Sequence, residues 1–276
     1  MNIKDIVFAD SDTLMKGKIP VKVYADTEAA FKAMADMMAE EIVSNNEKGK
    51  KTLFIVPVGP VGQYKYFAER VNKERISLKD VTFINMDEYM QDSKTLISPE
   101  DNLSFRKFMA EGCYGLIDKD LIMPESQRIF PSQDNAAFIE DVIARHGGSA
   151  DVCFGGIGIN GHMAFNEPPE PDELVTEAQF VNSTVRVQRI SRETRVVNAL
   201  NEFDGAYYVM PEYCVTVGLR QILGAKKIRL FCFRPWHRSV VRRAVLGTPS
   251  ITFPASLLQL SLIHISEPTR QAEISY

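Results

Sequence analysis

The sequence has 276 residues, of which 45% are hydrophobic and 25% are charged, and its formal net charge is −4. This composition is typical of a globular protein that is long enough to bury a substantial core. The acidic balance argues against a nucleic-acid-binding protein, because such proteins carry clustered positive charge.

Cysteine usage and the absence of long apolar runs indicate the compartment. The 4 cysteines show no CxxC spacing, and three of them lie in apolar segments. We therefore expect free thiols, no disulfides and no structural zinc. The first residues, MNIKDIVFADSD, lack the basic and apolar regions of a signal peptide, and no apolar run approaches the length of a membrane span. The expectation is a cytoplasmic protein.

Strand-like and helix-like segments alternate along the chain. The first half has predicted strands at 21–24, 52–58 and 81–86 and predicted helices at 27–45, 62–74 and about 101–112. Further on there are predicted helices at 134–146 and 236–246 and predicted strands at 151–156, 213–217 and 227–233. Continuous apolar strands between helices predict an α/β fold, an open three-layer sandwich with a mostly parallel sheet. Ligands of such sheets bind beyond the carboxyl ends of the strands, so the junctions there are the candidate sites.

The first junction is VPVGPVGQY (56–64), where a strand runs through glycines into a helix. Free N–H groups at a helix start attract anions, which makes Gly59 and Gly62 candidates for phosphate binding. The stretch lacks the Lys and Ser/Thr of a nucleoside-triphosphate-binding loop. A turn that needs glycines only for its geometry is an equally good interpretation.

The second junction is INMDEYM (84–90), where a strand delivers Asp87 and Glu88 to its carboxyl end. Adjacent carboxylates there could bind a metal, cap a helix or act as a base. A general base needs a partly desolvated carboxylate, because desolvation raises its pKa toward the working pH. The residues by themselves leave these alternatives open.

The third junction contains a literal G-x-G-x-x-G, formed by Gly156, Gly158 and Gly161. A dinucleotide-binding turn opens a helix and has an acidic residue about 20 positions later. Here three prolines at 168, 169 and 171 exclude a long helix, and no acid stands at the expected distance. We therefore interpret the glycines as a tight turn around a histidine.

That histidine, His162, lies between Asn160 and Glu167 on the loop. An imidazole that titrates near neutrality, oriented by an amide and a carboxylate, is suited to proton transfer. Metal binding is the less favoured alternative, since one His and one Glu make a thin ligand set.

The fourth segment is RVQRISRETRVVNA (186–199), in which Arg195 could hold a phosphate with two hydrogen bonds. A solvated surface helix is the more common explanation of such a charge run.

These segments, in this order, resemble the glucosamine-6-phosphate deaminase family of sugar-phosphate isomerase-like proteins. The resemblance rests on INMDEY (84–89), GIGINGHMAFNEP (156–168), ETRVVNA (193–199), VTVGLRQIL (215–223) and FPASLLQ (253–259). It implies a modified Rossmann-like α/β fold, with no nucleotide cofactor and no metal for catalysis. The implied activity is an aldose–ketose isomerisation coupled to loss of ammonia.

The resemblance also implies a role for each matching residue. Asp87 matches the base that moves a proton between C1 and C2 of the sugar. His162 matches the residue that opens the sugar ring, and Asn160 and Glu167 match its partners. Arg195 matches the arginine that holds the substrate phosphate.

Two departures from the family pattern concern the phosphate. The loop at 57–64 is two residues shorter than the family's P-T-G-[GS]-T-P-x-G-x-Y and lacks its hydroxyls. A lysine that contacts the phosphate in the family is replaced by His237, with Arg234 and Arg238 nearby as substitutes. The residues that match the family's proton-transfer groups are therefore kept, while the phosphate-binding segments differ. This pattern fits a paralogue that acts on another sugar phosphate or one that has lost activity.

The last residues, SLIHISEPTRQAEISY (261–276), do not continue the family pattern and resemble translated adapter sequence. We expect residues 1–260 to form a single domain that is truncated at its carboxyl end, followed by a non-native-looking tail. Loss of a terminal strand would expose a sheet edge.

The leading hypothesis is an amino-sugar phosphate deaminase/isomerase that converts glucosamine 6-phosphate, or a related hexosamine phosphate, to the ketose phosphate and ammonia. The alternatives are a non-catalytic sugar-phosphate-binding paralogue and a related isomerase or lactonase with altered specificity. The expected partner is the small-molecule hexosamine phosphate, with no nucleic acid and no membrane. The family includes monomers and hexamers, so a homo-oligomer is compatible with it.

Overall fold

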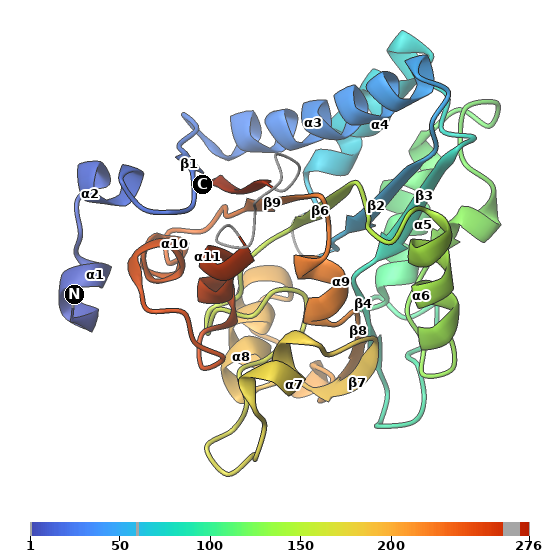
Figure 1. Ribbon diagram of the computed structural model, residues 1–276. Coiled ribbons are helices and arrows are strands. Elements are labelled where there is room, and N and C mark those ends of the chain that lie inside the picture. The colour runs from blue at the N-terminus through green and yellow to red at the C-terminus, as the bar shows by residue number, and fades with distance from the viewer. Residues whose placement is uncertain (1, 59–60, 262–270, 276) are drawn as a thin grey trace.

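The computed structural model describes residues 2–58, 61–261 and 271–275. Its described strands form a seven-stranded parallel sheet in the order β1-β10-β9-β6-β2-β3-β5 and a three-stranded antiparallel sheet in the order β4-β8-β7 (Figure 1). The parallel strands are β1 (Val21–Lys22), β2 (Thr52–Val56), β3 (Val81–Asn85), β5 (Arg128–Ile129), β6 (Val152–Gly155), β9 (Lys227–Phe231) and β10 (Gln271–Ser275). The antiparallel strands are β4 (Asp87–Met90), β7 (Arg186–Arg189) and β8 (Tyr213–Thr216).

Helices cover the parallel sheet on both faces (Figure 1). One face packs against α3 (Thr27–Glu47), α4 (Gln63–Glu74), α5 (Phe105–Gly112) and the 3-10 turn η1 (Tyr114–Leu116). The other face packs against α2 (Ser11–Met15), α6 (Ala136–Arg145), α7 (Glu177–Val181), α9 (Leu219–Leu223), α10 (His237–Leu246), α11 (Leu258–Ser261) and η4 (Pro254–Leu257). The remaining elements are α1 (Ile3–Val7), α8 (Arg192–Glu202), η2 (Glu125–Gln127) and η3 (Tyr207–Val209).

The central strands show why the fold has three layers. Successive side chains of a strand point to opposite faces, and in β2 all of them are apolar or small. Leu53 and Ile55 enter the core on the α10 side, whereas Phe54 and Val56 enter the core on the α3 side. A strand that is apolar on both faces must be covered on both, so the predicted three-layer α/β fold is confirmed.

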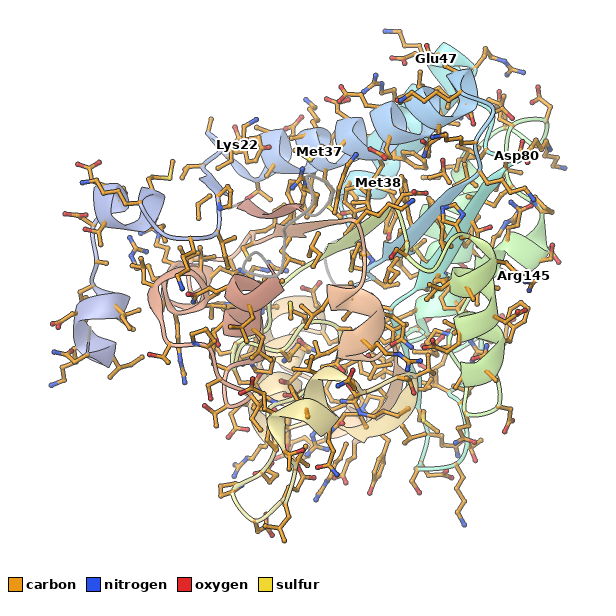
Figure 2. All side chains as sticks on the ribbon, in the orientation of Figure 1. Lys22, Met37, Met38, Glu47, Asp80 and Arg145 are labelled. Atoms are coloured by element: carbon orange, nitrogen blue, oxygen red, sulfur yellow. The ribbon has the colours of Figure 1, made fainter. Side chains whose placement is uncertain are left out.

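Helix α3 illustrates how one apolar stripe builds a layer. Its side chains at helical spacing, Met34 and Met38, are fully buried against the sheet, and Glu47 at its end is exposed. Figure 2 labels Met38 and Glu47 on this helix. The methionines are core residues, as their spacing indicates.

The small antiparallel sheet was not expected from the sequence. Strand β4 begins at Asp87, with only Met86 separating it from β3, so the two strands look like one in the sequence. Strand β7 has the polar sequence RVQR and is only partly buried, so it lacks the continuous apolar run that indicates a buried strand.

The tail lies partly within the described residues. Strand β10 pairs in parallel with β9 and with β1. This pairing does not test the origin of residues 261–276, so the division of the chain at residue 260 stays a prediction. In the part of the chain that the structure describes, none of the helices is long and apolar enough to cross a membrane.

One carboxylate joins several elements at the amino-terminal edge of the sheet, the side on which Asp80 and Arg145 are labelled in Figure 2. Asp151, just before β6, accepts hydrogen bonds from the backbone N–H of Leu53 at 2.9 Å, from His146 Nε2 at 2.7 Å and from Lys226 Nζ at 2.8 Å. Burial alone would raise the pKa of Asp151, but these partners outweigh it and lower the pKa to about 2. The ionised carboxylate therefore holds β2, β6 and the end of α6 together.

We expect Asp151→Asn to lower the free energy of unfolding at pH 7 by about 1–3 kcal/mol, since a buried charged acceptor is lost. The folded-state pKa lies below the ordinary value of 3.8, so this stabilisation is complete above about pH 5 and disappears as the pH falls toward 2. Urea unfolding at pH 7, 5, 4 and 3 measures the difference in the free energy of unfolding between wild type and variant, and this difference should become smaller as the pH falls. The control Asp141→Asn, which removes an exposed ion pair with Arg145 on α6, should change stability by less than about 0.5 kcal/mol. A difference in the free energy of unfolding that does not change with pH contradicts the prediction.

Candidate active site

The sequence-predicted site residues follow strands β2, β3, β6 and β9 or lie on α8 (Figure 1). Because the strands of the main sheet are parallel, their carboxyl ends meet at a single edge. Asp87 follows β3, the loop with Asn160, His162 and Glu167 follows β6, and His237 follows β9.

Asp87 is the first residue of β4, where the chain leaves the parallel sheet and enters the antiparallel one. It pairs with Thr216 of β8, and only 5% of its surface is exposed. None of the described residues donates a hydrogen bond to its carboxylate. Burial, together with the neighbouring charge of Glu88, raises the pKa of Asp87 well above its ordinary value. A desolvated carboxylate without hydrogen-bond donors is a strong base once it is ionised.

Glu88, the adjacent carboxylate, is a structural residue. Its Oε1 accepts from the backbone N–H groups of Tyr89 and Phe105, both at 2.9 Å. Its Oε2 accepts from Ser104 Oγ at 2.9 Å and from the backbone N and Nε of Arg106 at 3.0 and 2.9 Å. Five donors occupy this buried carboxylate, so it anchors the start of α5.

Asn160, His162 and Glu167 form a hydrogen-bonded group. His162 Nδ1 lies 2.8 Å from Asn160 Oδ1 and 3.5 Å from Glu167 Oε2, and Asn160 Nδ2 donates to Glu167 Oε2 at 2.5 Å. Burial raises the pKa of Glu167, but the charge of His162 and hydrogen bonds from His162, Asn160 and Thr194 lower it to about 2. Glu167 is therefore ionised beside the imidazole.

The glycines of this loop are required by the histidine. A Cβ on Gly158 would lie 1.9 Å from Cε1 of the His162 ring, which excludes every side chain at that position. Gly161 has a φ of +88°, and a Cβ there would lie 2.6 Å from the Phe253 ring. No helix begins at Gly161, since the next helix, α7, starts only at Glu177. The loop therefore lacks the geometry of a dinucleotide-binding turn.

Phe165 connects the Asp87 strand with the His162 loop. Its backbone N–H donates to Thr216 Oγ1 at 3.1 Å, and Thr216 is the β-partner of Asp87. The Phe165 ring centre lies 5.9 Å from that of His162 and 5.6 Å from that of Tyr89. Phe165 is thus adjacent both to Thr216, the β-partner of Asp87, and to the His162 ring.

Arg195 lies on α8 with its guanidinium partly engaged. Its Nη1 donates to Glu212 Oε1 at 3.0 Å and its Nη2 donates to Tyr207 Oη at 2.6 Å. Its Nε is buried and has no hydrogen-bond partner among the described residues. An unpaired buried donor of this kind is costly unless a ligand or water satisfies it.

The residues predicted for the phosphate cradle are less clearly arranged. A Cβ on Gly62 would lie 2.4 Å from the Phe31 ring, so this glycine is needed for close packing at the start of α4. Gly59 lies outside the described residues. His237 Nε2 donates to the Ile157 carbonyl at 3.0 Å, and its Nδ1 accepts from the backbone N–H of Arg234 at 2.9 Å. Both ring nitrogens of His237 are thus occupied by backbone groups, and its phosphate role stays a prediction.

Sequence reasoning missed two hydroxyls next to the histidine. Thr194 Oγ1 lies 3.3 Å from His162 Nδ1, and Ser191 Oγ accepts from Asn160 Nδ2 at 3.2 Å. Ser191 is the N-cap of α8, and its side chain accepts from the backbone N–H of Thr194 at 3.2 Å. The helix-start pattern of Ser191 was readable in the sequence, but its contact with a loop about 30 residues earlier was not.

Comparison with known proteins decides the family. No family model matches the chain. A glucosamine-6-phosphate deaminase of Aliivibrio fischeri is 30% identical over 226 residues, which cover 78% of both chains. The chain belongs to the glucosamine-6-phosphate deaminase family. A second member, from Phocaeicola vulgatus, is 28% identical over 249 residues, 87% of each chain, and the resemblance stated from the motifs is confirmed.

Solved structures show the same fold as this family member. A monomeric glucosamine-6-phosphate deaminase superposes with a TM-score of 0.73 at 24% identity, covering 92% of this chain and 96% of the other. A 6-phosphogluconolactonase from Shewanella baltica superposes with a TM-score of 0.62 at 17% identity, covering 95% and 99%. At these identities the similarity establishes the fold alone.

Because both ring nitrogens of His237 are hydrogen-bonded in a buried position, we expect this histidine to titrate below its ordinary pKa. Burial lowers the pKa of His237 to about 4, although the hydrogen bond from its Nε2 to the Ile157 carbonyl opposes this shift. Its ordinary pKa is 6.5, so the folded state stays neutral while the unfolded chain takes up a proton, and stability falls as the pH drops from about 6.5 toward 4. NMR titration of the histidine Cε1 protons should show one resonance that moves only near pH 4.

The His237→Gln variant assigns that resonance, because it should vanish while the other histidine signals remain. The variant should also lose less stability than wild type between pH 6.5 and 5. A His237 resonance that titrates near 6.5 contradicts the buried neutral state.

Proposed function

We propose that this protein is an amino-sugar phosphate deaminase that converts glucosamine 6-phosphate, or a related hexosamine phosphate, to the ketose phosphate with release of ammonia. The observation that carries the proposal is the pair of separate proton-handling groups beside one sheet edge. Asp87 is a buried carboxylate with a raised pKa and no hydrogen-bond donor in the described part of the chain, whereas His162 is held by Asn160 and an ionised Glu167. The curated relatives named above carry this activity in their names.

The reaction has two proton-transfer tasks, and each group is suited to one of them. Opening the sugar ring moves a proton at the ring oxygen, a transfer between electronegative atoms that an imidazole performs near neutral pH. His162, held by Asn160 and Glu167, is assigned to this step. Isomerisation moves a proton from C2 to C1, and a carboxylate without hydrogen-bond donors can accept this proton and return it.

Asp87 is assigned to the carbon-bound proton. It takes the proton from C2 of the open-chain sugar while the ammonium group of the substrate gives a proton to O1, which forms an enolamine. It then returns the C2 proton to C1, so that the C2–N bond becomes an iminium. Water then adds at C2 and ammonia leaves, which gives the ketose phosphate. The amine nitrogen, one water molecule and the transferred proton account for the whole reaction, and no redox cofactor is needed.

Arg195 is the proposed phosphate contact. It is the candidate whose guanidinium retains a buried Nε without a partner among the described residues. Arginine binds phosphate with two parallel hydrogen bonds more readily than a neutral histidine does. Both nitrogens of His237 are hydrogen-bonded to backbone groups. Binding of the substrate phosphate is therefore proposed to depend more on Arg195 than on His237.

The first test is ammonia release from glucosamine 6-phosphate. Asp87→Asn should lower kcat at least about 100-fold, because general base catalysis contributes about 10²–10⁴ in rate and an amide cannot accept the C2 proton. The matched control is Asp80→Asn on the opposite edge of the sheet, which should keep wild-type kcat. If wild type releases no ammonia from glucosamine 6-phosphate, the proposal is wrong.

Two further measurements, combined with the ammonia assay, separate the alternatives. Thermal stabilisation by hexosamine phosphates without ammonia would favour a binding protein, and hydrolysis of 6-phosphogluconolactone would favour a lactonase. The remodelled loop at 57–64 motivates the first alternative, and the shared fold motivates the second.

The pH profile is a second test. A base acts only when it is deprotonated, and the raised pKa of Asp87 means that protonation begins at a higher pH than the ordinary value of 3.8. We expect kcat/KM to fall on the acid side with a midpoint well above 3.8. Reassay at pH 7.5 after incubation at each pH controls for unfolding. Full activity down to pH 4 would contradict the assignment of Asp87 as the base.

A further inference from the structure

The amino-terminal end of α8 contacts the His162 group through two hydroxyls. Thr194 is 1% exposed, and its Oγ1 lies 3.3 Å from His162 Nδ1. Ser191 donates to Thr194 Oγ1 at 3.0 Å and accepts from Asn160 Nδ2 at 3.2 Å. These hydroxyls come from a helix about 30 residues after the histidine, so only the fold places them there.

The amide of Asn160 has one allowed orientation in this group. Its Nδ2 faces the Glu167 carboxylate at 2.5 Å, and a carboxylate only accepts hydrogen bonds. Its Oδ1 therefore faces His162 Nδ1 at 2.8 Å, and Nδ1 must be the donor. The amide and the carboxylate together favour the tautomer of His162 with the proton on Nδ1.

The hydroxyls extend this arrangement. Ser191 donates its proton to Thr194 Oγ1 at 3.0 Å. Thr194 Oγ1 lies 3.3 Å from His162 Nδ1. Because Asn160 Oδ1 requires the proton on Nδ1, the threonine oxygen is an acceptor toward Nδ1. It is therefore a second acceptor beside the Nδ1 proton.

We propose that Thr194, oriented by Ser191, is a positioning residue that fixes His162 as the Nδ1–H tautomer and so leaves Nε2 as the nitrogen that exchanges a proton with the substrate. Nε2 has no hydrogen-bond partner among the described residues, which is the state a proton-transfer atom needs. This inference rests on the proposed function for its catalytic consequence, but the tautomer itself is independent of any activity.

A helix-capping role alone does not explain Thr194. The cap of α8 is Ser191 Oγ, which accepts from the backbone N–H of Thr194, and that bond does not use the threonine side chain. Thr194→Val therefore removes the hydroxyl and keeps the cap, the shape and the burial. Thr194→Ser keeps the hydroxyl and removes only a methyl group.

The experiment measures the His162 tautomer by long-range ¹H–¹⁵N correlation at pH 8 and measures kcat and KM for ammonia release. Wild type should show His162 as the Nδ1–H form. Thr194→Val should show a mixture of tautomers and a kcat at least about tenfold lower, with KM changed less than about threefold. Thr194→Ser should restore both the tautomer and kcat.

The matched control is Thr52→Val, which removes a buried threonine hydroxyl bonded to Asn45 at the start of β2. It should leave kcat and the His162 signal unchanged. Ser191→Ala is a second variant that frees the Thr194 hydroxyl, and it should also produce mixed tautomers even where stability drops through loss of the cap.

Two results would overturn the proposal: Thr194→Val with pure Nδ1–H and unchanged kcat, or Thr194→Ser as impaired as Thr194→Val. Failure of the proposed function looks different, because wild type would then release no ammonia while the tautomer measurements still read out the role of Thr194.

Discussion

Burial of the parallel strands on both faces is the constraint on which the rest of this structure depends. Strands β2, β3, β6 and β9 carry apolar side chains into the two cores, so they offer no room for chemistry along their length. The polar groups of the candidate site follow the ends of the strands, where backbone and side chains regain contact with water or with one another. Because the strands are parallel, the ends that precede the functional loops meet at one edge. The site is a consequence of that packing.

Two buried carboxylates at this edge have pKa values shifted in opposite directions. Glu167 is surrounded by donors and by His162, so its charged form is stabilised although it is buried. Asp87 has no donor among the described residues and has Glu88 as its neighbour, so its charged form is disfavoured. Both are nearly inaccessible to solvent, so the difference between them lies in their neighbours. The charge of His162 and several hydrogen bonds lower the pKa of Glu167, whereas the charge of Glu88 adds to the rise in the pKa of Asp87.

Much of the fold was predictable, because long apolar periodicities report burial directly. The predicted strands and helices of the main sheet match the observed ones closely, as in α3 and β2. The small antiparallel sheet escaped prediction since β4 follows β3 almost without a break and β7 is polar. At the site, Asp87, Asn160, His162 and Glu167 stood out as polar residues at strand ends. The different environment of Glu88, with five donors from the start of α5 and its own backbone, had no local signal.

The sequence by itself determined the layer architecture, the turn around His162 and the family, because these depend on residue types at short spacings. Only the tertiary structure decided which neighbours each polar group has. In the folded chain, backbone groups hydrogen-bond to both nitrogens of His237. The fold also places Ser191 and Thr194 beside the His162 group. Hydrogen bonds are directional and short-ranged, so the protonation states and tautomers of the site depend on contacts between segments far apart in the chain, which no local pattern encodes.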